Sequence, residues 1–192
     1  MDGNTGHNRP LDKDLRGYLE TNADIVTHIT KPVSIDNIGA LSAQSETPIV
    51  FENIIEHPGF RMCDILVKHR HTQCRALGVP QEEYLPTLAK RLRQPPRGFV
   101  DVETGPVKEV IHTGADVDWT KLPNPIHSSH ENAPYISAMN IIRDPETGFY
   151  NSCHAGTSPT EPTRGFISFI TPHSHQIMAK YRAMGIDEMP IA

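Results

Sequence analysis

The sequence predicts an α/β layer in residues 1–100, followed by a mostly antiparallel β domain in residues 101–192. In the first half, short apolar segments alternate with stretches of helical periodicity, as in an α/β layer. The composition then changes at Gln94-Pro95-Pro96-Arg97-Gly98, which is typical of a domain boundary. Beyond this point apolar segments of strand length dominate, and a turn sequence joins two of them.

The first elements of the α/β layer follow from periodicity and capping. A helix is expected over Leu11–Asn22, because leucines recur every four residues on one face. A strand over Asp24–Thr30 comes next. Ser34 is a suitable N-cap for a second helix that runs through Leu41.

The rest of the layer is expected to repeat this alternation. Pro48–Phe51 and Cys63–Val67 are compact apolar segments of strand length. A helix over His71–Leu77 should end at Gly78, since glycine favours the left-handed C-cap. Another helix is expected over Pro80–Leu92 despite an internal proline.

Strands dominate the second half. Four are expected, over Val107–Thr113, Tyr135–Arg143, Phe149–Ala155 and Gly165–Ile170. The turn Asp144–Gly148 joins two of them as a hairpin, because Pro145 fixes a turn φ and Gly148 tolerates a positive φ. A loop rich in proline and threonine should precede the last strand, and a helix should cover Ser174–Met184.

The apolar segment Met189–Ala192 stands at the end of the sequence. Termini are usually polar and exposed, and an antiparallel sheet without its later strands leaves unpaired edges. We therefore expect the fold to continue on further residues or on a second chain. The alternative is a short edge strand that ends there.

Composition excludes several classes of protein. Apolar residues make up 37% and charged residues 21%, so a globular chain is expected. The formal net charge is -5 and no basic stripe is present, which argues against nucleic acid as a partner. No apolar run reaches the roughly 18 residues of a membrane span, and the N-terminus does not resemble a signal peptide. Three widely spaced cysteines indicate the reducing cytoplasm.

Asn151 and His173 are candidate ligands of a metal. They are expected near the ends of neighbouring strands, where an amide oxygen and an imidazole nitrogen suit an ion such as Mn²⁺. Two ligands are too few, so at least one carboxylate should join them. The competing interpretations are an asparagine that caps the hairpin and a histidine bonded to backbone in a helical first turn.

Other polar residues give weaker signals. His127 and His130 form a second polar cluster, but no zinc-binding spacing accompanies them. Cys153 and His154 are adjacent on a strand and point to opposite faces, so they cannot pair with each other in catalysis. No glycine-rich phosphate loop is present.

Several segments together resemble the UbiD family of decarboxylases. They lie in order along nearly the whole chain: Asp14–Leu19, Pro48–Asn53, Arg75–Gly78, Pro106–Val110, Gly114–Asp118, Leu122–Pro123, Pro134–Ile136 and Asp144–Gly148 through Asn151. The run from Pro106 onwards is the most specific part of the resemblance.

This resemblance implies a split-β-barrel flavin-binding fold, incomplete at the C-terminus, for the second domain. It also implies prenylated FMN as cofactor, held through Mn²⁺ or another divalent metal with a nearby K⁺. Asn151 and His173 match the metal-binding residues of the family. Ser152, Cys153, His154 and Ala155 match the strand that lines the flavin in the family. Pro172 matches the residue before the metal histidine. The third metal ligand of the family is a glutamate on a later strand, beyond Ala192.

The sequence departs from the family at Gly156, where the family carries a catalytic arginine five residues after the metal asparagine. Glycine cannot bind a carboxylate. Arg164 is a weaker substitute, because it would have to return across the loop. The catalytic glutamates of the family also lie outside this sequence, so the catalytic residues remain unknown.

The resemblance implies a carboxy-lyase that reversibly decarboxylates a small aromatic or α,β-unsaturated acid. Space at Gly156 would suit a thioester or another bulky aromatic substrate. The alternative is a non-catalytic flavin- or metal-binding subunit or a truncated form that needs a partner chain. A plain reductase-like split barrel is a weaker third reading. The expected macromolecular partner is a second copy, in a homo-oligomer, or a complementary C-terminal chain.

Overall fold

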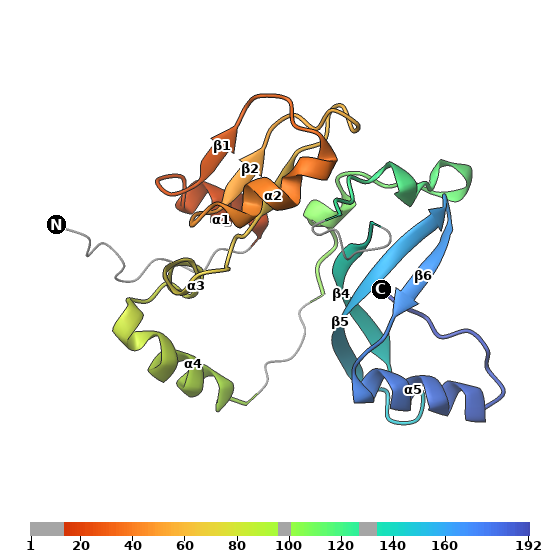
Figure 1. Ribbon diagram of the computed structural model, residues 1–192. Coiled ribbons are helices and arrows are strands. Elements are labelled where there is room, and N and C mark those ends of the chain that lie inside the picture. The colour runs from red at the N-terminus through yellow and green to blue at the C-terminus, as the bar shows by residue number, and fades with distance from the viewer. Residues whose placement is uncertain (1–13, 96–100, 127–133) are drawn as a thin grey trace. The chain divides into compact units, whose positions relative to one another are not determined.

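The computed structural model describes residues 14–95, 101–126 and 134–192 (Figure 1). The chain divides into two compact units, residues 1–111 and residues 112–192. Each unit has its own three-stranded sheet and its own buried cluster. They are described separately below.

The sheet of the first unit is small and mixed. It contains β1 (Thr27–Ile29), β2 (Ile49–Phe51) and β3 (Met62–Asp64) in that order. β2 is parallel to β1 and antiparallel to β3, with Val50 opposite both His28 and Cys63. Strands are present at all three predicted places, but each has only three residues, and β3 includes only Cys63 and Asp64 of the predicted Cys63–Val67.

The core of this unit lies around the central strand β2. All three of its residues are buried, and Phe51 is completely inaccessible to solvent. Ile38, which begins the helix before this strand, and Ile54, which follows the strand, pack against it. Burial of a large apolar side chain contributes about 1.5–3 kcal/mol. This cluster therefore holds the sheet and the helix that begins at Ile38 together.

Four helices accompany the sheet: α1 (Leu15–Thr21), α2 (Ile38–Ala43), α3 (Arg70–Leu77) and α4 (Tyr84–Leu92). Asp14 caps α1 by accepting a hydrogen bond from Gly17 N at 2.8 Å. The buried Tyr18 donates from its hydroxyl to Leu66 O at 2.6 Å, which fixes α1 to a distant loop. As predicted, α3 ends at Gly78 with a left-handed φ of 72°.

The expected cap of the second helix is partly wrong. Ser34 precedes a 3₁₀ turn (Ile35–Asn37) that leads into α2, but its side chain caps no backbone group. Its hydroxyl instead donates to Glu56 Oε1 at 2.6 Å, while Glu56 Oε2 accepts from Ile35 N at 2.8 Å. The distant carboxylate thus performs the capping, and these hydrogen bonds lower the pKa of Glu56.

The predicted helix over Pro80–Leu92 is a 3₁₀ turn (Gln81–Glu83) followed by α4. Pro86 is the third residue of α4. The first turn of a helix has no internal acceptors for its N–H groups, so a proline there removes no hydrogen bond. The internal proline of the sequence is therefore compatible with the helix.

The predicted strand over Val107–Thr113 is wrong. A 3₁₀ turn covers Pro106–Lys108, and the residues that follow belong to no strand. Val107 is 87% exposed. Strand preference depends on a partner strand and a buried face, and no strand of the described residues pairs with this segment.

The sheet of the second unit is antiparallel. Its strands are β4 (Ile136–Arg143), β5 (Tyr150–Glu161) and β6 (Arg164–Ser168), in sequence order. The predicted hairpin between β4 and β5 is confirmed, with Ile142 opposite Asn151. The predicted loop after Gly156 is largely wrong, because β5 continues to Glu161.

Pro159 lies within this unexpected extension. It pairs with Gly165 at a shift in register, and a bulge of this kind accommodates a residue that lacks an N–H donor. Trp119 supports the turn that follows: its Nε1 donates to Glu161 O at 2.7 Å and to Arg164 O at 3.2 Å. A side chain on Gly165 would collide with Trp119 and with Ser158 O, so glycine is required there.

Helix α5 (Pro172–Ala183) packs against one face of this sheet at the end near the β4–β5 turn (Figure 1). Ile177 of α5 is buried against Ile142 and Cys153. The partly buried side chains that complete this cluster are Phe169, Tyr181 and Met189. The helix matches the one predicted over Ser174–Met184, with its start two residues earlier.

The residues after α5 return to the outer edge of β4. Ile191 bridges Ile142, and Ile141 and Ala192 exchange backbone hydrogen bonds of 2.7 and 3.1 Å. Met189 packs against the core, whereas Ile191 is 43% exposed. The predicted α/β and antiparallel layers are present, and the described strands form no closed barrel. No described helix combines the length and apolar character that a membrane span requires.

Candidate cofactor and metal site

The turn between β4 and β5 fixes the start of the strand that carries Asn151. Asp144 N donates to Phe149 O at 2.8 Å, and Gly148 has a left-handed φ of 73°. Asp144 Oδ1 accepts from the backbone N–H groups of Glu146 and Thr147 at 2.9 and 3.1 Å. The turn is therefore specified by its aspartate and its glycine.

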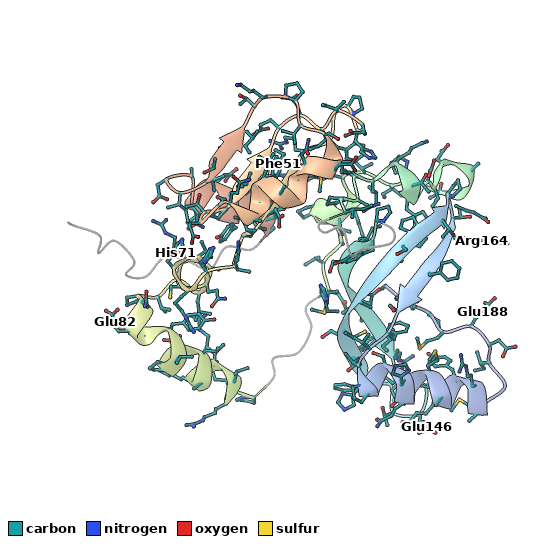
Figure 2. All side chains as sticks on the ribbon, viewed as in Figure 1. Phe51, His71, Glu82, Glu146, Arg164 and Glu188 are labelled. Atoms are coloured by element: carbon teal, nitrogen blue, oxygen red, sulfur yellow. The ribbon has the colours of Figure 1, made fainter. Side chains whose placement is uncertain are left out.

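Lys180 joins α5 to this turn. Its ammonium group lies 2.7 Å from Asp144 Oδ2 and 2.9 Å from Glu146 Oε2. Figure 2 shows Glu146 beside α5. The hydrogen bond from Lys180 lowers the pKa of Asp144 to about 2, and the same carboxylates raise the pKa of Lys180. The helix and the start of β5 are thus held together near Asn151.

Asn151 is the second residue of β5. It lies opposite Ile142, so the two side chains share the face that α5 covers. Its Nδ2 is buried and has no hydrogen-bond partner among the residues that the structure describes. A buried amide without a partner is costly, so a further group is expected to bind this side chain. It does not cap the hairpin, since Asp144 and Thr147 provide the side-chain acceptors there.

His173 is the second residue of α5 and is exposed. The buried Ser174 anchors this first turn, with its hydroxyl 2.5 Å from Thr171 Oγ1. Pro172 occupies the first helical position, where its missing N–H has no consequence. His173 thus lies on the helix that covers the Asn151 face, although the two residues make no direct hydrogen bond.

The predicted flavin-lining residues alternate between the faces of β5. Cys153 and Ala155 are buried on the α5 side, whereas Ser152 and His154 are exposed on the opposite side. The opposite orientation of Cys153 and His154 is as predicted. A ligand on one face of β5 therefore meets two of these side chains, together with backbone from the others.

Two contacts near Gly156 were not expected. A Cβ placed on Gly156 would lie 3.2 Å from Cδ2 of Tyr135, so the aromatic ring occupies the space expected to be open. Ser137 Oγ and His154 Nε2 form a hydrogen bond of 2.8 Å across the strands. Only the register that sets Ser137 opposite Gly156 brings these residues together, and the sequence does not specify that register.

Arg164 does not lie near Gly156. It begins β6 opposite Glu161, whereas Gly156 is opposite Ser168, about 13 Å further along the strand. Figure 2 shows Arg164 at the end of the sheet distant from α5. Among the described residues no three histidine, cysteine, aspartate or glutamate side chains are grouped to hold a metal. His127 and His130 lie outside the described residues.

Comparisons with known proteins match both parts of the chain. Residues 99–192 match the UbiD family, described as the 3-octaprenyl-4-hydroxybenzoate carboxy-lyase Rift-related domain. The anhydromevalonate phosphate decarboxylase of Methanosarcina mazei is 32% identical over 144 residues, which cover 74% of this chain and 32% of that protein.

Solved structures of UbiD-class enzymes resemble this chain in fold. The UbiD-class enzyme HmfF from Pelotomaculum thermopropionicum, in complex with FMN, has a TM-score of 0.82 at 28% identity. This match covers 92% of the present chain and 41% of HmfF. An evolved dimeric form of HmfF in complex with prFMN gives the same TM-score and identity over 42% of that chain.

The α/β unit and the antiparallel sheet backed by one helix follow the fold of part of the UbiD-class enzyme HmfF. The chain belongs to the UbiD family, and residues 99–192 carry the match to its domain. It spans about a third of the curated relative and about two fifths of HmfF, at 32% and 41%.

Proposed function

We propose that this chain supplies the N-terminal part of a carboxy-lyase that reversibly decarboxylates an aromatic or α,β-unsaturated acid. The observation that carries the proposal is the family match over residues 99–192, which includes β4, β5 and α5 with both candidate metal ligands. A decarboxylase and a UbiD-class enzyme are among the proteins that match.

The cofactor of the proposed reaction is prenylated FMN. HmfF has been solved with FMN and with prFMN, and this chain follows its fold over 92% of its length. When bound, the cofactor supplies the electron-accepting centre for cleavage of the carbon–carbon bond. Ser152 and His154 would contact it through side chains, and Cys153 and Ala155 through backbone.

Asn151 and His173 would hold the metal that binds the cofactor phosphate. The Nδ2 of Asn151 is buried without a partner among the described residues, and a phosphate oxygen of the cofactor would accept its hydrogen bond while the amide oxygen binds the metal. An amide oxygen with an imidazole nitrogen suits Mn²⁺, with K⁺ nearby. We assign the remaining carboxylate ligand to a segment outside these 192 residues, which also completes the split barrel.

A second candidate function is a flavin- or metal-binding subunit without catalytic activity of its own. Gly156 favours it, because this chain lacks a guanidinium group at that position. In either case the proposed partner is a second copy or a complementary C-terminal chain, and the evolved HmfF structure is described as dimeric. Three free cysteines are consistent with the reducing cytoplasm that we propose as its location.

Native mass spectrometry tests the proposal on the protein co-produced with a flavin prenyltransferase and Mn²⁺. We expect a mass increase equal to prenylated FMN and one divalent ion. Asn151→Ala and His173→Ala should each lose the metal by elemental analysis, while the matched variant His112→Gln retains it. Retention of cofactor and metal without decarboxylation of any acid would favour the non-catalytic subunit. Absence of both from the folded wild type would contradict the site.

A further inference from the structure

The face of the β4–β5 sheet that is turned away from α5 carries, beside the proposed cofactor contact His154, three side chains with no assigned role. Ser137 and Met139 lie on β4, opposite Gly156 and His154 of β5. Side chains that are directly opposite share a face, and Cys153 and Ala155 are buried on the other one. We call Ser137, Met139, His154 and Gly156, with the adjacent Tyr135, the open face.

His154 is oriented on the open face by a hydrogen bond. Ser137 Oγ lies 2.8 Å from its Nε2, so one ring nitrogen is engaged. When the serine hydroxyl donates this bond, Nδ1 carries the proton of the neutral imidazole and can donate to a ligand. Within the described residues no hydrogen bond to Nδ1 is formed. In that tautomer the imidazole offers a fixed donor at the surface of the strand.

Tyr135 closes the position beside this histidine. Its ring lies so near Gly156 that an added Cβ would be 3.2 Å from Cδ2. The position of the expected arginine is therefore lined by an aromatic ring and backbone. Met139, directly opposite His154, is 60% exposed and adds a second apolar side chain. A planar apolar group that carries one anionic end fits this combination.

We propose that His154, oriented by Ser137, binds the carboxylate of the substrate acid in place of an arginine at position 156. Tyr135 and Met139 would contact the apolar part of the same substrate. The proposal rests on the proposed function, since the substrate is the acid that the enzyme decarboxylates. A carboxylate accepts a hydrogen bond from an imidazole N–H, and a charged acceptor strengthens such a bond.

A metal is a less suitable ligand for this group. The open face offers one imidazole, the hydroxyls of a serine and a tyrosine, and a thioether, and none of its five residues is an aspartate or glutamate. A divalent metal needs several strong ligands, of which carboxylates are usual for Mn²⁺ and Mg²⁺. A carboxylate needs only a donor and a surface for its apolar part.

Equilibrium binding to the full chain, loaded with prenylated FMN and Mn²⁺, tests the assignment. Two acids, 4-hydroxybenzoate and cinnamate, are compared with the neutral amides 4-hydroxybenzamide and cinnamamide by calorimetry. His154→Leu should weaken binding of a recognised acid at least about tenfold and weaken binding of its neutral amide by a clearly smaller factor. His154→Gln retains an N–H donor and should recover part of the loss.

Ser137→Ala should weaken acid binding by a smaller factor, because only the orientation of the imidazole is lost. The matched histidine control is His112→Gln, which lies outside the sheet and should bind as the wild type. Flavin absorbance and hydrogen exchange establish that each variant is folded and loaded. A structural role of His154 would weaken binding of acid and amide equally.

The outcomes separate this inference from the proposed function. If the loaded wild type binds the acids and His154→Leu binds them equally well, the role of His154 is overturned while the function stands. Absence of acid binding by a loaded wild type also overturns the role. If the folded wild type retains neither cofactor nor metal and decarboxylates no acid, the proposed function fails, and this inference fails with it.

Discussion

At the scale of single residues, Gly156 and Tyr135 determine what the open face can bind. Glycine leaves room for a neighbouring ring, and the ring of Tyr135 fills that room. The space that the sequence suggested for a bulky substrate is thus occupied by the protein itself. A ligand on this face would contact the ring of Tyr135 at position 156, and its polar contact must come from another residue of the open face.

We predict that the cost of a side chain at position 156 depends on Tyr135. Gly156 has no positive φ, so alanine would gain from reduced unfolded-state entropy if no clash occurred. Against Tyr135 we expect Gly156→Ala to lower the free energy of unfolding by about 1 kcal/mol. In the Tyr135→Ala background the same change should be neutral or stabilising. Urea denaturation of the four proteins measures the coupling, and equal effects in both backgrounds would contradict the contact.

The sequence could indicate Asn151 and His173 through their residue types and the family resemblance. It could not show that the amide of Asn151 is buried without a partner, because this depends on α5 covering the strand. The Ser137–His154 hydrogen bond was also inaccessible, since it depends on a cross-strand register that local sequence does not determine. The features of the site that depend on contacts between residues far apart in the sequence could therefore be identified only from the structure.

At the scale of elements, the main connection in the second unit joins the β4–β5 turn to α5. Asp144 has two roles in it: one carboxylate oxygen closes the turn and the other binds Lys180. The geometry of the turn and the position of the helix are therefore coupled through one side chain. Because Asn151 follows the turn and His173 begins the helix, this coupling affects the relative position of both candidate ligands.

We predict that Lys180→Met lowers the free energy of unfolding at neutral pH. The same variant should lose less of that free energy than the wild type as the pH falls. The pKa of Asp144 is lowered from 3.8 to about 2, so its contribution is complete above pH 3.8 and is lost as pH falls through 2. The raised pKa of Lys180 gives a contribution that is complete below pH 10.5 and lost at higher pH. Thermal unfolding from pH 2 to pH 7 tests this, with Lys180→Arg as the control that retains the charge.

The prediction requires that wild type and Lys180→Met differ more at pH 7 than at pH 2. A constant difference across that range would show that the ion pair does not cause the stabilisation. A part of the shift in the pKa of Asp144 should persist in the variant, because the backbone N–H groups of Glu146 and Thr147 still donate to its carboxylate.

Elements with strong local signals were predicted well, and those that depend on a partner were not. Gly78 ends α3 and Gly148 closes the hairpin, as expected from the conformations that glycine permits. Val107–Thr113 has residues that favour strands but pairs with none, whereas β5 extends through Pro159 because β6 pairs with it. Strand length is thus set by pairing more than by composition.

At the scale of the whole molecule, the chain contains two units with separate buried clusters. Phe51 is at the centre of the first cluster and Ile142 of the second. Both side chains are almost fully buried, so each unit has its own source of stability. The domain division near residue 100 remains our proposal, with the compact units separating at residues 111 and 112.

We predict that core truncations act locally. Phe51→Ala should cost about 3–5 kcal/mol and raise hydrogen exchange in β1–β3, while β4–β6 retain their protection. Ile142→Ala is the reciprocal control and should produce the opposite pattern. Hydrogen exchange read by mass spectrometry on the full chain distinguishes the two. If Phe51→Ala accelerates exchange equally throughout, the chain unfolds as one cooperative body.

The indole of Trp119 spans the β5–β6 turn with two hydrogen bonds, and it is the only tryptophan in the sequence. Intrinsic emission excited selectively at the indole therefore originates entirely from the second unit. Stopped-flow fluorescence can follow the formation of that turn during refolding without an attached dye. The protein thus contains its own site-specific optical probe, placed at the end of the sheet distant from α5.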